Sequence, residues 1–159
     1  MKKILLLILM LSACNPSKTP KKYKRVTYVF VVKDAKKLHY EFTKAPIEGM
    51  VQYKYSCKEF ADRGISFTYS KEQESIIWLG EVFKINSNQQ IMLPRLSKKP
   101  FKIYDIVMPY SDASGPLIFN PDYGLLVLYN SYGPVLTFLK NEDSTLAEQL
   151  YDFETLITE

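Results

Sequence analysis

The chain has 159 residues, of which 47% are apolar and 14% aromatic, and its formal net charge is +4. This composition is too apolar for an intrinsically disordered chain, and the length fits one globular domain. Two cysteines and a single histidine leave few residues for a zinc site or a histidine-dependent active site.

The N-terminus has the layout of a secretory signal peptide. Lys2 and Lys3 precede an unbroken apolar run over residues 4–11, which is too short to cross a bilayer core about 30 Å thick. A basic segment, a short apolar segment and then small residues are typical of a segment that is removed by cleavage. We therefore expect residues 1–13 to be absent from the mature protein.

The end of the apolar run, Leu11-Ser12-Ala13-Cys14, resembles the lipobox of bacterial lipoproteins. The resemblance implies that Cys14 receives a diacylglyceryl group, that cleavage occurs just before it, and that the new amino terminus is acylated. Several acyl chains on one residue suffice for stable membrane anchoring. Asn15 follows in place of an aspartate, and under the enteric sorting rule this favours the outer over the inner membrane of the cell envelope.

Residues 14–25 are predicted to form the lipid anchor and a basic tether. Residues 15–25 hold five Lys and Arg, two prolines and no acid, whereas from Val26 onward 14 Lys and Arg stand against 17 Asp and Glu. Basic residues beside an anchor are attracted to anionic lipid head groups. Nucleic acid is not an expected partner, because these charges do not lie on a folded face.

Residues 26–159 are predicted to form one β-rich domain. Apolar and polar residues alternate with a period close to two, which indicates antiparallel strands joined by short polar links. The strands are expected at 26–32, 37–43, 50–57, 64–70, 76–86, 101–108, 117–120, 125–130 and 135–140. Long helices between strands are missing from the pattern, which argues against a parallel α/β sheet.

The stretch FNPDYGLLVLYN, residues 119–130, predicts a hairpin with a glycine-dependent turn. Pro121 and Asp122 suit the central positions of a turn, and Gly124 can adopt positive φ. The stretch is similar to strand–turn–strand segments that end in a Tyr-Gly pair in small secreted or lipid-anchored bacterial proteins. That resemblance implies no activity.

The final stretch, 141–159, is the one predicted helix, because Leu146, Leu150, Phe153 and Ile157 recur at helical spacing. Thr145 with Glu148 resembles a capping box, and Asp143 and Ser144 are alternative caps. The expected fold is α+β: a mostly antiparallel sheet of roughly seven to nine strands, strongly bent or partly closed, with this helix on one face. A small closed β-barrel with an internal cavity is the alternative.

Candidate catalytic residues are few. His39 lies on the polar face of its predicted strand, which favours an exposed side chain over a catalytic base. Cys57 alternates with Tyr53 and Tyr55, which favours a buried, unreactive thiol. We therefore expect no catalytic, metal-binding or cofactor-binding residues, and no enzymatic activity.

Tyrosines are the remaining candidates for a binding surface. The chain has twelve, and Tyr104, Tyr110 and Tyr132 lie in or beside predicted links, where an amphipathic ring suits an interface. High β-propensity is the alternative explanation for so many tyrosines. The expected function is a non-catalytic binding or structural module of the cell envelope that engages a protein or a glycan. The alternative is a carrier that holds an apolar ligand or lipid inside the sheet.

Overall fold

The computed structural model describes residues 20–31, 34–108, 114–130 and 133–152. These residues form ten strands and one helix. In chain order the elements are β1 (Lys21–Val31), β2 (Asp34–Ile47), β3 (Met50–Cys57), β4 (Ile65–Ser70), β5 (Ser75–Trp78), β6 (Glu81–Ile91), β7 (Phe101–Ile106), β8 (Ser114–Asn120), β9 (Gly124–Asn130), β10 (Val135–Leu139) and α1 (Ser144–Asp152).

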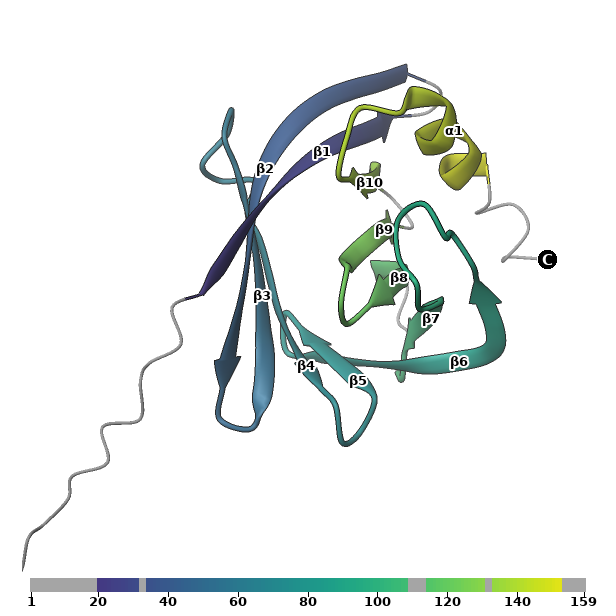
Figure 1. The fold of residues 1–159 in the computed structure, drawn as a ribbon. Helices are drawn as coiled ribbons and strands as arrows, with labels where there is room; N and C mark the ends of the chain where they lie inside the picture. Colours follow the sequence, from purple (N-terminus) through teal and green to yellow (C-terminus); the bar gives the residue numbers. More distant parts are fainter. Residues whose placement is uncertain (1–19, 32–33, 109–113, 131–132, 153–159) are drawn as a thin grey trace, which may run out of the picture.

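The strands close into a barrel in which every neighbouring pair is antiparallel (Figure 1). Each strand pairs with the next in the chain, and β1 closes the ring by pairing with β10, with Val26 opposite Leu139 and Phe30 opposite Val135. The β-rich architecture and the single C-terminal helix are as predicted. Of the two predicted forms of the sheet, the closed barrel is confirmed.

The tenth strand arises because the predicted strand 76–86 is two strands. β5 ends at Trp78 and β6 begins at Glu81, which pairs with Trp78 across a turn of two residues. Those residues, Leu79 and Gly80, have φ values of 52° and 83°. Leucine rarely occupies such a turn, so the sequence pattern shows an uninterrupted apolar run there.

The barrel begins earlier than predicted, at Lys21 rather than Val26. Lys21 pairs with Lys44, and Arg25 pairs with Tyr40, in one continuous ladder between β1 and β2. The predicted tether of residues 14–25 is therefore wrong over its last five residues, which belong to the first strand. The basic, polar composition of residues 21–25 indicates a tether. Alternation, by contrast, indicates a strand, because Tyr23, Arg25 and Thr27 lie on the same inward face of β1.

Aromatic side chains fill the interior of the barrel. Ten Phe and Tyr side chains belong to the inner cluster, and most contact another ring at centroid distances between 4.7 and 6.2 Å. They are Tyr40, Phe42, Tyr53, Tyr55, Phe67, Tyr69, Phe83, Tyr104, Phe119 and Phe138. Close-packed aromatic rings supply much of the stabilising burial in such a core.

The helix covers one side of the barrel, outside β1 and β10 (Figure 1). Its apolar residues Leu146 and Leu150 are buried, and Tyr151 stacks on Phe30 at 4.8 Å. Asp143 caps the helix: its carboxylate accepts from the Leu146 amide at 2.9 Å. This cap is one of the predicted alternatives to Thr145, and Phe153 and Ile157 lie outside the described residues.

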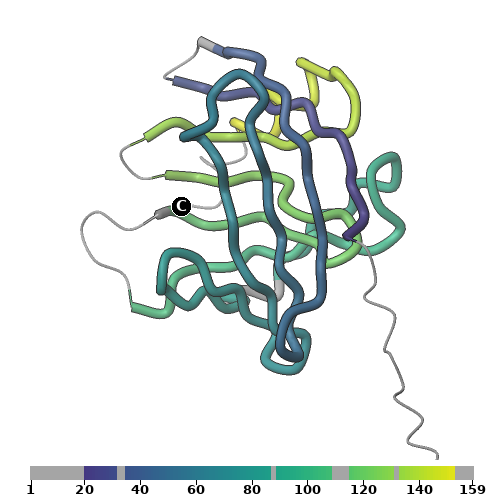
Figure 2. Tube along the Cα trace, turned by 90° about the vertical axis from the view of Figure 1, so that its left-hand side faces the viewer, coloured from purple at the N-terminus to yellow at the C-terminus, as the bar shows by residue number. Residues whose placement is uncertain are grey.

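The register defines two ends of the barrel. The start of β1, the turn between β8 and β9 and the segment 92–100 lie together at one of them, called here the β1 end (Figure 2). The turn between β5 and β6 and the last residues of β7 lie at the opposite end, because Phe83 pairs with Ile106. Any functional surface can therefore be placed relative to the point where the chain enters the barrel.

Candidate functional site

The predicted tyrosine surface is wrong at Tyr104. This side chain is 0% exposed and lies inside the barrel, with its ring 5.8 Å from that of Phe119. It lies in the middle of β7, where alternation directs it inward, so it cannot contact a partner. Tyr110 and Tyr132, like Cys14, lie outside the described residues.

Several tyrosines instead form hydrogen bonds through their hydroxyl groups to the backbone of other strands, of the turn between β8 and β9, or of α1. Tyr53 donates to the Pro121 carbonyl and Tyr129 to the Leu150 carbonyl, both at 2.7 Å. The Tyr55 hydroxyl accepts from the Leu125 amide at 2.7 Å. Tyr123 donates to the Phe138 carbonyl at 2.8 Å, and burial raises its pKa to about 12. Neutral hydroxyls paired with the backbone are structural groups, which accounts for much of the tyrosine content.

The inner side chains leave little free space around the inner end of Trp78. The gap at this point is too narrow to admit a water molecule. Its walls are Ile65, Phe67, Trp78, Leu117, Leu125 and Leu128. A ligand of lipid size needs several hundred cubic ångströms, so the packing here gives no support to a carrier that uses the barrel interior.

His39, Glu59 and Cys57 lie together at the opposite end, but in an order that does not suit catalysis. The Glu59 carboxylate accepts from the His39 ring at 2.7 Å and its backbone amide at 3.0 Å, which lowers the pKa of Glu59 to about 2. The buried Cys57 thiol lies 3.5 Å from the same carboxylate. A nucleophile needs the imidazole beside the thiol, whereas here the carboxylate separates them. As predicted, His39 is exposed and Cys57 is buried and unpaired.

Metal-ligating side chains do not gather within the described ranges either. No group of three or more His, Cys, Asp or Glu residues among them is suited to hold a metal ion.

An open pocket of about 560 Å³ lies outside the barrel, along β6 and the end of β7. Its apolar wall is formed by Val82, Ile106, Val107 and Met108, and polar residues stand around it. We call it the apolar pocket; the residues lining it are Gln73, Gly80, Glu81, Val82, Lys84, Ile106, Val107 and Met108. Its volume is in the range of sites that bind ligands or partner side chains.

Exposed apolar side chains concentrate beside this pocket. Met108 and Leu79 are each 80% exposed, and Val82 and Val107 are 38% and 49% exposed. Scattered single apolar residues are normal at a protein surface, whereas a group of them beside a pocket marks an interaction site.

Leu79 is unfavourable for stability in a second way besides its exposure, since its backbone adopts positive φ in the turn between β5 and β6. The left-handed conformation costs a residue with a β-carbon about 1–2 kcal/mol. The described chain has the same kind of turn between β2 and β3, where Glu48 and Gly49 have φ values of 45° and 79°. A leucine that is strained and exposed at once points to a role other than stability.

We therefore expect Leu79→Asn to stabilise the protein by about 0.5–1 kcal/mol, because asparagine tolerates positive φ and favours this turn. Urea denaturation of the purified protein measures the change. Glu48→Asn is the matched control, since it makes the same improvement in the equivalent turn. If Leu79→Asn alone destabilised the fold, the leucine would contribute to stability through contacts, and its proposed role at the surface would fail.

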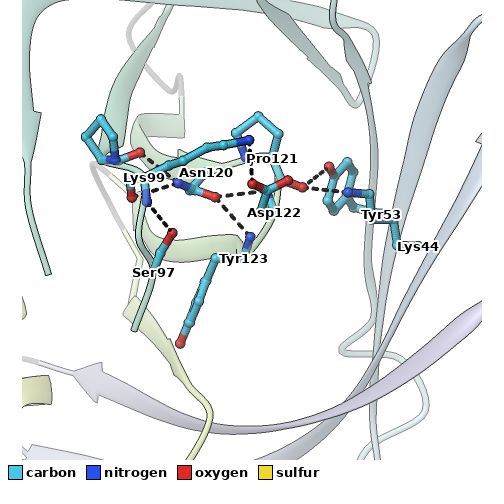
Figure 3. A network of polar contacts seen from close by, with 9 residues as sticks. Lys44, Tyr53, Ser97, Lys99, Asn120, Pro121, Asp122 and Tyr123 are labelled. Carbon is cyan, nitrogen blue, oxygen red and sulfur yellow. Dashed lines mark hydrogen bonds and ion pairs between the residues drawn. The ribbon is translucent and has the colours of Figure 1, made fainter. Parts of the chain in front are cut away.

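A network of polar contacts surrounds the turn that joins β8 and β9 at the β1 end (Figure 3). The buried Asn120 side chain accepts from the amides of Asp122 and Tyr123 at 2.8 and 3.0 Å. It also donates to the carbonyls of Lys99 and Pro100, at 3.0 and 2.7 Å. The segment before β7 is thereby fastened to the turn. The Asn-Pro-Asp sequence is a signal for such an Asx-type turn, although the prediction singled out only the residues after Asn120.

Cations surround this turn. Lys44 donates to the Pro121 carbonyl at 2.7 Å, and Lys99 pairs with Asp122 at 2.7 Å. Partial burial lowers the pKa of Lys44, and repulsion from Lys99 and Lys21 adds to this, against the attraction of Asp122. Several positive charges therefore share a small region of the surface.

Arg25 lies beneath these lysines and is 5% exposed. Its guanidinium donates to the Tyr123 carbonyl at 2.7 Å and lies over the rings of Tyr123 and Phe42, at 4.7 and 5.1 Å. Carbonyl dipoles and ring faces stabilise the cation but do not cancel its charge. It therefore adds to the positive potential of this end.

No family model, curated protein or solved structure matches the chain. None of the helices formed by the described residues is long and apolar enough to span a membrane.

Proposed function

We propose that the protein is a non-catalytic binding module of the bacterial cell envelope. It is held to the membrane by lipid on Cys14 and binds a partner through the apolar pocket. The lipobox residues Leu11-Ser12-Ala13-Cys14 support the anchor. The observation that supports binding most strongly is the group of exposed apolar side chains around a pocket outside a barrel whose interior is packed with aromatic rings.

A protein segment is the proposed partner, because the site has the composition of a protein–protein interface. Its lining combines apolar Val82, Val107 and Met108 with polar Gln73, Glu81 and Lys84, and protein–protein interfaces likewise combine apolar and polar residues. Leu79 and Met108, the second of which also lines the pocket, are each 80% exposed to solvent. Such side chains suit insertion into a partner's surface better than the sequestration of a small molecule.

Photo-crosslinking in intact cells tests this proposal. A photoreactive amino acid at Met108 or Leu79 should give a crosslinked protein adduct. The matched control position is Met92, which is 54% exposed and follows the end of β6 at the β1 end. Adding Val82→Asp should abolish the adducts at Met108 and Leu79, because burying a carboxylate in an apolar contact is costly. Equal adducts at Met92, or adducts that survive Val82→Asp, would contradict the proposed site.

An apolar ligand in the same pocket is the second candidate, because about 560 Å³ could hold part of an acyl chain or a similar molecule. Native mass spectrometry of the protein purified from membranes distinguishes the two. A co-purifying lipid that is lost in Val82→Asp would favour the carrier.

A further inference from the structure

Lysines gather at the β1 end. Lys21, Lys44, Lys98, Lys99 and Lys140 lie at this end, and we call them the basic end. Lys44 is close enough to Lys21 and Lys99 for their repulsion to lower its pKa, and Lys140 lies 5.1 Å from the Tyr123 ring that also covers Arg25. Of the nearby carboxylates, Asp122 pairs with Lys99, Glu142 pairs with Lys37, and Asp143 caps α1.

The chain enters the barrel at this same end, where β1 begins beside the turn between β8 and β9 (Figure 2). Lys21 is seven residues beyond Cys14. A fully extended segment of seven residues spans at most about 25 Å. If Cys14 is lipidated, the basic end cannot be further than this from the head groups. The turn between β5 and β6 lies at the opposite end of the barrel. The exposed apolar residues of the pocket, Val82, Val107 and Met108, lie near this turn, whereas Gln73, in the turn between β4 and β5, lines the side of the pocket nearer the β1 end.

We propose that the basic end docks on the anionic surface of the bilayer and so directs the apolar pocket away from the membrane. The inference rests on the proposed lipid anchor for bringing the two surfaces together. Attraction between lysines and anionic lipids falls off within a Debye length, which is about 8 Å at physiological ionic strength. The short connection between Cys14 and Lys21 allows an approach to this distance, and the uncompensated charge of Arg25 strengthens the attraction.

Lysine reactivity in vesicles tests the docking. The full-length protein, purified from membranes, is placed in vesicles containing phosphatidylglycerol and in vesicles of phosphatidylcholine alone. Amine labelling read by mass spectrometry should be at least about fivefold slower at Lys98 and Lys99 in the anionic vesicles. High salt should remove this protection. Lys36 and Lys58, which are exposed away from the basic end, should react equally in both.

Two charge-matched variants separate docking from net charge. In Lys21→Gln, Lys98→Gln, Lys99→Gln, the remaining Lys140 should lose its protection in anionic vesicles. In the control Lys36→Gln, Lys58→Gln, Arg63→Gln, which removes as many charges from exposed positions away from the basic end, Lys140 should keep it.

The failure of the docking and the failure of the anchor give different results. A protein with lipid on Cys14 whose basic-end lysines react equally in both vesicles would overturn the docking and leave the anchor intact. If the native protein purified from membranes carried no lipid but still bound anionic vesicles with the same lysines protected, the proposed anchor would be overturned and the docking supported. Equal protection in phosphatidylcholine vesicles would also overturn it, because the attraction would then not depend on lipid charge.

Discussion

Cys14→Ala should move the protein from the membrane fraction to the salt-extractable fraction and abolish its labelling with a radioactive fatty acid. The expected change is close to all-or-none, because the thiol is the only attachment point for the diacylglyceryl group implied by the lipobox. Fractionation of cells, followed by a high-salt wash and detection of the protein, measures the change. The salt wash is needed because the basic end should bind anionic head groups without the lipid.

Cys57→Ala is the matched control for the anchor. Cys57 is the other cysteine of the chain and is buried inside the barrel, so its removal should leave lipid labelling and fractionation unchanged. The mass of the mature protein provides an independent check, since it should exclude residues 1–13. A mature protein that retained those residues, or a Cys14→Ala variant that resisted the salt wash, would disprove the lipoprotein interpretation.

Gly124→Val should destabilise the barrel by about 3 kcal/mol or more. Gly124 has φ of 99°, a conformation that L side chains rarely adopt, and a β-carbon there would clash with the Tyr55 hydroxyl and lie 3.2 Å from Phe42 Cζ. The clash would also displace the Tyr55 hydroxyl from the Leu125 amide, leaving a buried donor without its partner. Urea denaturation of the purified protein gives the free energy of unfolding.

Gly49→Val separates backbone strain from the clash. Gly49 also has positive φ, at 79°, but a β-carbon there meets nothing within 4 Å. We expect it to cost only about 1–2 kcal/mol. If the two substitutions were equally destabilising, steric contact with Tyr55 and Phe42 would not contribute, and the packing of the turn against these rings would be looser than the structure indicates.

The sequence predicts the strands of this fold better than its closure. Alternation places most strands within a few residues of their observed bounds, because one face of each strand is apolar along its length. The turn at Leu79 and Gly80 is not predicted, because an apolar residue stands where asparagine or aspartate is expected in such a turn. The pairing of β1 with β10 joins residues at opposite ends of the domain, and single-strand patterns carry no information about such a partner.

The candidate site was harder to predict, because the exposure of a side chain depends on which strands surround it. The link that follows Tyr104 in the sequence suggests an exposed side chain, yet its position on β7 buries it. The basic composition around Arg25 predicts a solvated tether, yet ring faces and carbonyl groups surround the Arg25 side chain and bury it. The apolar pocket combines residues from β6, the two turns on either side of β5, and the end of β7. Alternation predicts these strands, but it does not predict that residues from them meet to form one pocket.

The closure of the barrel by its first and last strands also governs how the protein can fold. The hydrogen bond from Arg25 to Tyr123 joins residues 98 positions apart, and that from Leu125 to Tyr55 joins residues 70 apart. Folding that depends on such distant contacts has a high contact order and is slow, because loop-closure entropy is lost before the contacts form. During synthesis from the N-terminus, the barrel therefore cannot close until β10 has been made, because β1 has no other strand to pair with on that side.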